Sequence, residues 1–325
     1  MTTIYYPTDA NADAIAGQSV AVVGYGNQGR SWALNLRDSG LDPRVCVRAD
    51  ASRDLARTDG FDTGDLHDAS GADIVCILVP DDAIPQVPLD RGDDSLTIVA
   101  SGYALAFEQI DPPGDQAMIA PRMLGPEVRG CYEEGVGFIT ALGVHQDRTG
   151  TALARTLALA DALGGLRQGA IAMTPRQEAV LDLGVEQVLS PALTHVNNAF
   201  VQTMLANDIP LEAIVTELVL SGEVERSYRL LREIGFAAQL DFHSPTSQYG
   251  QLSRRGRFDH FDVRQTMDEL TAEITSGQFS EEWAAESDRG HPKLEALRSQ
   301  HAGSAVLEFE AELRRRLGPS ASPAP

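Results

Sequence analysis

Residues 18–29 read QSVAVVGYGNQG, a β-branched apolar run that ends directly on three glycines in the order G-x-G-x-x-G. The next stretch, residues 28–39, has helical spacing and stops before a further glycine. In such a strand–turn–helix setting Gly24 allows the tight turn, Gly26 lets the backbone approach a pyrophosphate, and Gly29 permits close helix–strand packing. The stretch therefore predicts a dinucleotide-binding turn at the start of an α/β sheet.

Further short apolar runs follow at the spacing of alternating strands and helices. Each is apolar nearly throughout and is bounded by Gly, Pro or Asp, which favours a parallel sheet covered by helices on both faces. A helix is expected over residues 149–164. We therefore predict a Rossmann-type, doubly wound parallel sheet for residues 1–173, with strands after the first over residues 44–47, 73–79, 96–100, 116–120 and 137–144.

From about residue 175 the apolar residues change to helical spacing, and no comparable strand pattern occurs. Residues 174–317 are therefore predicted to form a second, all-helical domain. The last residues, 318–325, read GPSASPAP and are expected to be a disordered tail. The expected helical stretches are residues 177–204, 211–234, 263–276, 280–287 and 304–317.

The chain of 325 residues is strongly acidic, with 26 basic and 47 acidic side chains and a formal net charge of -21. Such a surface repels phosphate backbones and anionic lipids, so nucleic-acid or membrane binding is not expected. No apolar run approaches the ~18 residues that span a bilayer, and no secretory signal is visible at the N-terminus. The three cysteines, Cys46, Cys76 and Cys131, are widely spaced and are read as reduced thiols of a cytoplasmic protein.

The residue at the end of the second strand helps to distinguish NAD from NADP. Here it is Arg48, followed by Ser52 and Arg53, and two guanidinium groups with a hydroxyl suit a 2′-phosphate. The alternative is a solvated loop, since Asp50 and Asp54 dilute the positive charge. The sequence favours NADPH over NADH, with expected cofactor-binding residues Gly24, Tyr25, Gly26, Asn27, Gln28, Gly29, Arg48, Ser52, Arg53, Val79 and Pro80.

Several segments are similar to the ketol-acid reductoisomerases, the acetohydroxyacid isomeroreductases of branched-chain amino acid synthesis, in their short form. They are IYYPTDAN (4–11), VVGYGNQGRSWALNLRDSG (22–40), the motifs APR, LG, EVR, YEEGVGF and VHQDRTG within residues 120–150, SGQFSEEW (276–283) and GHPKLEALR (290–298). The resemblance runs from about residue 3 to residue 317.

This resemblance implies a Rossmann domain followed by a knotted helical domain, and a homodimer or larger homo-oligomer with shared active sites. In the family two Mg²⁺ ions, held by carboxylates, polarise an acetohydroxy acid for alkyl migration, and NADPH then delivers hydride to this small-molecule substrate.

The resemblance also implies the metal-binding carboxylates, and here the match is incomplete. The first pair corresponds to Asp182 and Glu186, whose i, i+4 spacing puts both on one helix face. The second pair is expected as E-x-x-x-E. Glu217 fits its first position, but Ser221 stands four residues later, and Glu223 fits only if residues are inserted. Metal binding is therefore left uncertain.

Two further positions depart from the family pattern. The family's histidine is Ser101, within Ser101-Gly102-Tyr103, and its lysine is Arg122. Tyr103 could donate a proton from this loop or could be a packing ring. Ser244 matches the family's substrate-contacting serine, but could equally be a turn serine before a proline.

These departures lead us to expect an NADPH-dependent reductase that has lost the metal-dependent isomerase step and reduces a C=O or C=N bond. Arg122 would stabilise an oxyanion, whereas Asp182 or Glu186 would hold a protonated imine. One alternative is a genuine ketol-acid reductoisomerase in which Glu217 and Glu223 complete the metal cage through a helix irregularity. Another is a catalytically silent NADPH-binding paralogue.

Overall fold

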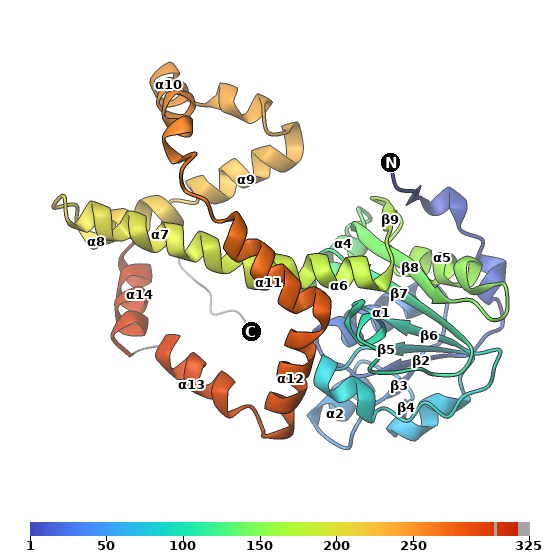
Figure 1. Ribbon diagram of the computed structural model, residues 1–325. Coiled ribbons are helices and arrows are strands. Elements are labelled where there is room, and N and C mark those ends of the chain that lie inside the picture. Colours follow the sequence, from blue (N-terminus) through green and yellow to red (C-terminus); the bar gives the residue numbers. More distant parts are fainter. Residues whose placement is uncertain (302–303, 318–325) are drawn as a thin grey trace. The chain divides into compact units, whose positions relative to one another are not determined.

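The computed structural model describes residues 1–301 and 304–317 (Figure 1). The chain divides into two compact units, the first spanning Met1–Leu183 and the second beginning at Gly184. The domain boundary expected between residues 173 and 174 stays a prediction, and the expected tail, 318–325, lies outside the described residues.

The N-terminal unit is built on one nine-stranded sheet in the order β1-β9-β8-β7-β6-β5-β2-β3-β4. From β7 to β4, neighbouring strands in that order are parallel. The strand bounds are β1 Ile4–Tyr5, β2 Val20–Val23, β3 Arg44–Cys46, β4 Thr63–Gly64, β5 Ile74–Ile77, β6 Leu96–Val99, β7 Asp115–Pro121, β8 Thr140–Gln146 and β9 Ala170–Ala172.

All six strands predicted from the sequence are confirmed, as β2, β3, β5, β6, β7 and β8. The predicted parallel sheet is confirmed from β7 to β4, and on its other side β8 is antiparallel to β7 and β1 is antiparallel to β9. The chain leaves β7 at Pro121, forms a short helix and returns directly along the same edge. An antiparallel return of this kind needs no crossover to the opposite end of the sheet.

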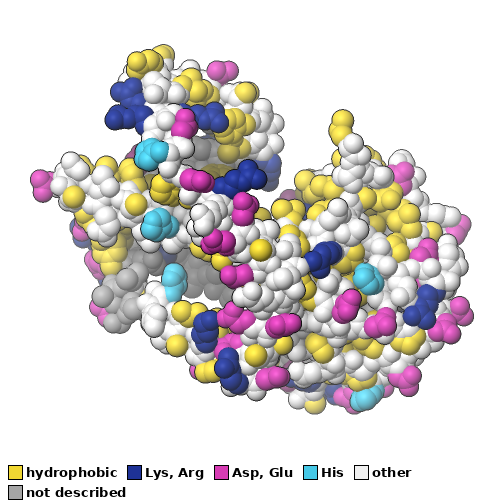
Figure 2. All heavy atoms as spheres, viewed as in Figure 1, with side chains coloured by type: hydrophobic (Ala, Val, Ile, Leu, Met, Phe, Trp, Pro, Cys, Tyr) yellow, Lys and Arg dark blue, Asp and Glu magenta, His cyan; other side chains and the backbone are white. Residues whose placement is uncertain are grey.

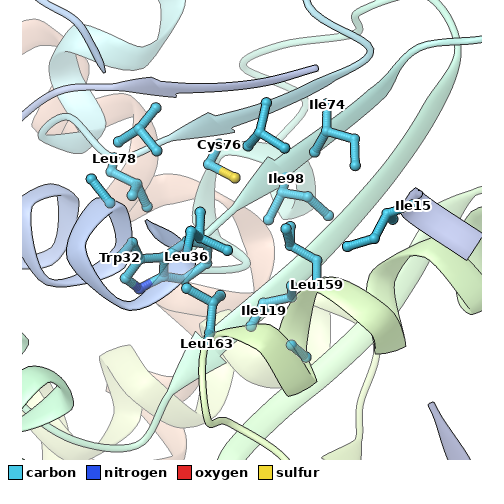
Figure 3. Packing of buried hydrophobic residues seen from close by; sticks show 14 of the residues in the cluster. Ile15, Trp32, Leu36, Ile74, Cys76, Leu78, Ile98, Ile119, Leu159 and Leu163 are labelled. Atoms are coloured by element: carbon cyan, nitrogen blue, oxygen red, sulfur yellow. The ribbon is translucent and has the colours of Figure 1, made fainter. Parts of the chain in front are cut away.

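Both faces of the sheet are buried, as the continuous apolar strands predict. Along β2, Val22 packs into one buried cluster and Val23 into the cluster on the opposite face. On the first face, Trp32 and Leu36 of α1 lie with Leu159 of α5 against the sheet (Figure 3). Each such fully buried side chain contributes ~1.5–3 kcal/mol. This packing holds the strand ends, where the loops carry the functional residues, in fixed positions.

Six α-helices belong to or begin in this unit: α1 Asn27–Asp38, α2 Ala51–Thr58, α3 Tyr103–Ala106, α4 Gly125–Glu133, α5 Ala152–Ala162 and α6 Pro175–Gly184. Short 3-10 helices occur at Pro7–Asp9 (η1), Ala12–Ile15 (η2), Leu66–Gly71 (η3) and Asp81–Gln86 (η4). The helices predicted over 28–39 and 149–164 are confirmed as α1 and α5.

The described residues of the C-terminal unit form helices and no strand, as predicted; the knotted path implied by the resemblance stays a prediction. The α-helices are α7 Ser190–Leu205, α8 Leu211–Val215, α9 Glu223–Ile234, α10 Pro245–Arg254, α11 Arg264–Ser276, α12 Gln278–Asp288, α13 Pro292–His301 and α14 Ser304–Leu317, with 3-10 turns at Ala238–Phe242 (η7) and Arg255–Phe258 (η8).

Two segments of this unit are π-helical, Val185–Leu189 (η5) and Thr216–Leu220 (η6). The single helix expected over 211–234 is therefore wrong in detail. It is α-helical, then π-helical, and is interrupted at Gly222, whose φ of 74° lies in the left-handed region that favours glycine. The sequence reveals this interruption only as a serine–glycine pair within an otherwise helical pattern.

Acidic side chains are spread over the face of the molecule drawn in Figure 2, in line with the net charge. Within the described residues, no helix has the length and apolar character needed to cross a membrane. All three cysteines are free. Burial raises the pKa of the Cys76 thiol to about 12 and that of the Cys46 thiol to about 11, so both are unreactive at neutral pH.

Candidate active site

The sequence-predicted residues of the N-terminal unit gather in loops that follow the parallel strands. The glycine turn follows β2, Arg48 follows β3, Val79 follows β5, Ser101 follows β6 and Arg122 follows β7. Because these strands are parallel, their carboxyl ends meet at one edge of the sheet, where α/β proteins bind their ligands.

A cleft of about 480 Å³ opens beside the glycine turn at this edge. It is lined by the predicted cofactor residues Gly24, Tyr25, Gly26, Arg48, Ser52, Val79 and Pro80, and by Val47, Asp50, Leu66, Leu78, Asp82, Ala83, Gln86 and Val87. The remaining predicted residues of the turn, Asn27, Gln28 and Gly29, form the first residues of α1.

The three glycines of the turn have different surroundings. A Cβ on Gly24, whose φ is +99°, would lie 2.5 Å from the carbonyl oxygen of Leu78, and one on Gly29 would lie 2.2 Å from that of Gly24. A Cβ on Gly26 would meet no atom within 4 Å. Gly24 and Gly29 thus permit the close packing of the turn, while Gly26 borders open space at the start of α1, where backbone N–H groups can bind a pyrophosphate.

Arg48 and Ser52, both predicted to bind the cofactor, line this cleft. Arg48 reaches across it, with Nη2 3.5 Å from Oε1 of Gln86. Ser52 lies in the first turn of α2, and its N–H donates to the capping carboxylate of Asp50. The half of the cleft that follows β3 therefore combines one cation, a hydroxyl and a helix N-terminus.

Arg53 is not brought into the cleft. Its Nη2 donates to the carbonyl oxygen of Val47 and to Oδ1 of Asp65, which fastens the chain between β3 and the loop after β4. Of the two arginines predicted to bind a 2′-phosphate, Arg48 lines the cleft and Arg53 does not. Tyr25 borders the cleft, but its hydroxyl donates to Oδ2 of Asp59 at 2.9 Å, and burial raises its pKa.

A second cluster forms where β6, β7 and α6 meet. The guanidinium of Arg122 joins two carboxylates of α6, with Nη1 bonded to Oε1 of Glu178 and Nη2 2.7 Å from Oδ1 of Asp182. The other oxygen of Glu178 accepts the backbone N–H of Gly102 at 2.6 Å. This cluster therefore ties the loop after β6, the end of β7 and the carboxylate helix together.

Glu178 is the residue of this cluster that the sequence reasoning missed. Its side chain is only 2% exposed, and burial raises its pKa although Arg122 and the Gly102 N–H act in the opposite direction. The available signal was spacing, because Glu178, Asp182 and Glu186 recur at i, i+4 and i+8 along one helical stripe. In a chain with 47 acidic residues, that recurrence does not stand out.

The loop after β6 places Ser101 and Tyr103 differently. The Oγ of Ser101 accepts the backbone N–H of Tyr103 at 3.2 Å. Tyr103 begins α3 and is 4% exposed, and its ring packs edge-to-face on Phe107 with centroids 5.1 Å apart. This burial favours the packing alternative for Tyr103 over proton donation.

The other predicted residues belong to the C-terminal unit. Glu186 lies in the first π-helical segment and Glu217 in the second, so the helix irregularity considered for Glu217 is present. Glu223 is the first residue of α9. Ser244 caps α10, accepting the N–H of Ser247 at 3.3 Å, which matches its reading as a turn serine. Within the described ranges, no group of three or more His, Cys, Asp or Glu side chains is arranged to hold a metal ion.

Two family models match the chain. Residues 14–169 match the acetohydroxy acid isomeroreductase, NADPH-binding domain, and residues 176–318 match the ketol-acid reductoisomerase, C-terminal domain. The expectation of an NADPH-dependent oxidoreductase is thereby confirmed.

Named relatives and a solved structure agree with these models. The chain is 38% identical over 303 residues to a ketol-acid reductoisomerase (NADP(+)) of Saccharolobus solfataricus, covering 90% of this chain and 89% of the relative. It is 34% identical over 328 residues to that of Methanocaldococcus jannaschii, covering 98% and 99%. An NADH-preferring ketol-acid reductoisomerase from an uncultured archean superposes with a TM-score of 0.88 at 27% identity, covering 98% of this chain and 100% of that chain.

These likenesses overturn one expectation. A reductase that has lost the isomerase step, and an imine reductase in particular, is wrong for this chain, because the relatives that match both of its domains are named ketol-acid reductoisomerases. The misleading signal came from four local departures, at Ser101, Arg122, Ser221 and Glu223, which weigh less than similarity along nearly the whole sequence.

Proposed function

Because the chain belongs to the ketol-acid reductoisomerase family, we propose that it converts acetolactate to 2,3-dihydroxyisovalerate with NADPH and Mg²⁺. Alkyl migration turns the 2-hydroxy-3-keto acid into a 3-hydroxy-2-keto acid. Hydride from NADPH then adds to the new C2 carbonyl carbon, and a proton adds to its oxygen, to give the dihydroxy acid.

One observation carries this proposal: the cofactor cleft and the cluster of Arg122, Glu178 and Asp182 follow parallel strands at the same edge of one sheet. The cleft suits a dinucleotide, and the cluster offers carboxylates and a cation to a small acid. Two half-reactions that share one substrate require such groups along a common edge.

The donor chemistry along α6 fits a magnesium ion. Mg²⁺ prefers hard oxygen ligands and uses few protein carboxylates, and Asp182, with its side chain 43% exposed, offers such a group. We assign Asp182 and Glu186 to this role, with Glu217 or Glu223 contributed by a second chain. Bound there, the ion would act as a Lewis acid that polarises the hydroxyl and carbonyl oxygens of the substrate.

The other residues hold groups of the site in position and balance its charge. Glu178 holds Arg122 on one oxygen and the backbone of Gly102 on the other, which fixes the loop beside the reacting groups. Arg122 supplies a cation that stabilises negative charge on a substrate oxygen. Gly26 and the first turn of α1 bind the pyrophosphate, and Arg48 with Ser52 binds the 2′-phosphate.

The proposal is tested by following NADPH oxidation with acetolactate and Mg²⁺, using the purified full-length chain. We expect turnover that EDTA abolishes and added Mg²⁺ restores. A parallel assay supplies the rearranged 3-hydroxy-2-keto acid, which needs only the reduction. Turnover of this second substrate but not of acetolactate would contradict the proposal, and so would turnover of neither.

We also propose a cytoplasmic homodimer, or a larger homo-oligomer, whose active sites combine residues of two chains. The resemblance in the helical unit supports this assembly, and the three free cysteines fit a reducing compartment. Light scattering of the purified protein measures the assembly directly, and a monomeric mass with full activity would contradict it.

A further inference from the structure

Arg122 has one guanidinium group for two carboxylates in very different surroundings. The side chain of Glu178 is 2% exposed, whereas that of Asp182 is 43% exposed. Arginine can bind both because its planar fork offers separate N–H groups, Nη1 to Glu178 and Nη2 to Asp182. Lysine, the residue that the family resemblance places here, has a single ammonium nitrogen.

The ion pair engages an oxygen of the carboxylate that is the first metal ligand in the proposed function. We propose that Arg122 and the divalent cation compete for Asp182, so that the guanidinium sets the Mg²⁺ affinity of the enzyme. This inference rests on the proposed function. Arg122 is then a positioning residue for the metal site, in addition to its charge on the substrate side.

The asymmetry of burial decides which of the two contacts gives way. Releasing Glu178 would leave a buried carboxylate without its charged partner, which is costly. Releasing Asp182 transfers a half-exposed carboxylate from a guanidinium to a metal ion and its water, which costs little. Arg122 therefore stays on Glu178 when Mg²⁺ takes Asp182, and the Gly102 loop that Glu178 holds does not move.

The experiment compares Mg²⁺ binding to the wild type and to Arg122→Lys, by isothermal titration calorimetry on the full-length chain without substrate or cofactor. Lysine keeps the charge and pairs with the buried Glu178, so Asp182 is released. Because a partly exposed ion pair contributes only a small stabilising free energy, we expect the variant to bind Mg²⁺ about three- to five-fold more tightly. Because lysine is the residue of the family pattern, the variant is expected to fold, which circular dichroism checks.

Arg129→Lys is the matched control, because Arg129 also bridges two carboxylates of the same unit, Asp38 at 2.6 Å and Glu133 at 2.9 Å. Its Mg²⁺ affinity should equal that of the wild type. Asp182→Asn should remove the binding in both backgrounds.

The outcomes separate this inference from the proposed function. If Arg122→Lys binds Mg²⁺ as tightly as the wild type or more weakly, the proposed competition is wrong. It is also wrong if Arg129→Lys gains as much Mg²⁺ affinity as Arg122→Lys. Either result leaves the proposed reaction standing. If neither the wild type nor Arg122→Lys binds Mg²⁺ saturably, the proposed metal-dependent reaction fails, and the competition fails with it.

Discussion

The role of each arginine at the strand ends is decided by its neighbours. Arg53 donates its hydrogen bonds to the carboxylate of Asp65 and to the backbone carbonyl of Val47, so its role is structural. Arg48 donates to the amide oxygen of Gln86 at 3.5 Å and faces the cofactor cleft. The preference for NADPH over NADH should therefore depend on Arg48 and not on Arg53.

Replacement of Arg48 by alanine should weaken NADPH binding about ten-fold or more, because a hydrogen bond to a charged group is worth ~1.5–3 kcal/mol. NADH lacks the 2′-phosphate, so its affinity should barely change. Fluorescence titrations with both cofactors measure the two constants. Arg44→Ala, which removes an ion pair with Asp62 at the opposite end of β3, is the control. Equal losses for NADPH and NADH in Arg48→Ala would show that the 2′-phosphate is bound elsewhere.

Glu178 gives a prediction for pH. Burial raises its pKa above the ordinary value of 4.5, so the folded state binds this proton more tightly than the unfolded state does. The stabilising contribution of Glu178 is therefore fully present below pH 4.5 and is lost as the pH rises through the raised pKa.

Glu178→Gln mimics the protonated acid at every pH. We expect the stability of the wild type, relative to this variant, to fall as the pH rises above 4.5, and denaturant unfolding at several pH values measures it. Activity of the variant should fall as well, since Arg122 loses its buried partner. A stability difference independent of pH would contradict the raised pKa.

Among the secondary-structure elements, the periodicity of apolar residues predicts the helices that are long and the strands that are wholly buried. The six strands and the helices α1 and α5 follow from it, whereas β1 and β4 have two residues each and carry no pattern. The direction of β8 depends on how the chain returns from β7, which the apolar spacing does not record. The role of Glu178 was not predicted for a related reason: tertiary packing buries this side chain, and the spacing of residues in the sequence does not record that packing.

Gly102 tests the contact between the loop after β6 and α6. A Cβ there would lie 2.0 Å from the carbonyl oxygen of Pro175, the first residue of α6, so Gly102→Ala must displace the helix or the loop. We expect a loss of stability and at least a ten-fold loss of activity, measured by thermal unfolding and by the acetolactate assay.

Gly130→Ala is the control for that change. It lies within α4, and its Cβ would meet no atom within 4 Å, so the substitution should stabilise the chain by ~0.5–1 kcal/mol. If Gly102→Ala were equally neutral, the contact with Pro175 would not constrain the site.

The π-helical segment distinguishes Glu217 from Glu223. π-bulges occur frequently at functional sites, and Glu217 lies inside one, whereas Glu223 begins α9, where an acid favours the helix dipole. Glu217→Gln should therefore reduce the Mg²⁺-dependent turnover of acetolactate about 100-fold or more, because losing even a group that hydrogen-bonds to a metal ligand costs about 10- to 100-fold. Glu223→Gln should change turnover by less than about three-fold and cost ~0.3–1 kcal/mol of stability. The reverse order would assign the ligand to Glu223.

For the molecule as a whole, the proposed assembly makes a prediction by mixing. If each site combines Asp182 of one chain with Glu217 of another, Asp182→Asn and Glu217→Gln are both inactive alone. Refolded together, they form mixed dimers with one intact site. Random pairing of two chains then restores about a quarter of the wild-type activity. No recovery, with mixed dimers demonstrated, would place all the ligands within a single chain.

The π-helical segment Thr216–Leu220 also bears on how such chains diverge. A π turn accommodates one residue more than an α turn, so a single-residue insertion or deletion at this point leaves α8 and α9 intact. Because the wider turn takes up the extra residue, the side chains beyond it keep the faces of the helix that they had before. The sequence spacing of the carboxylate ligands can thus change by one residue without a change of architecture. A motif that requires acidic residues at a fixed spacing will therefore miss active homologues that have this helix.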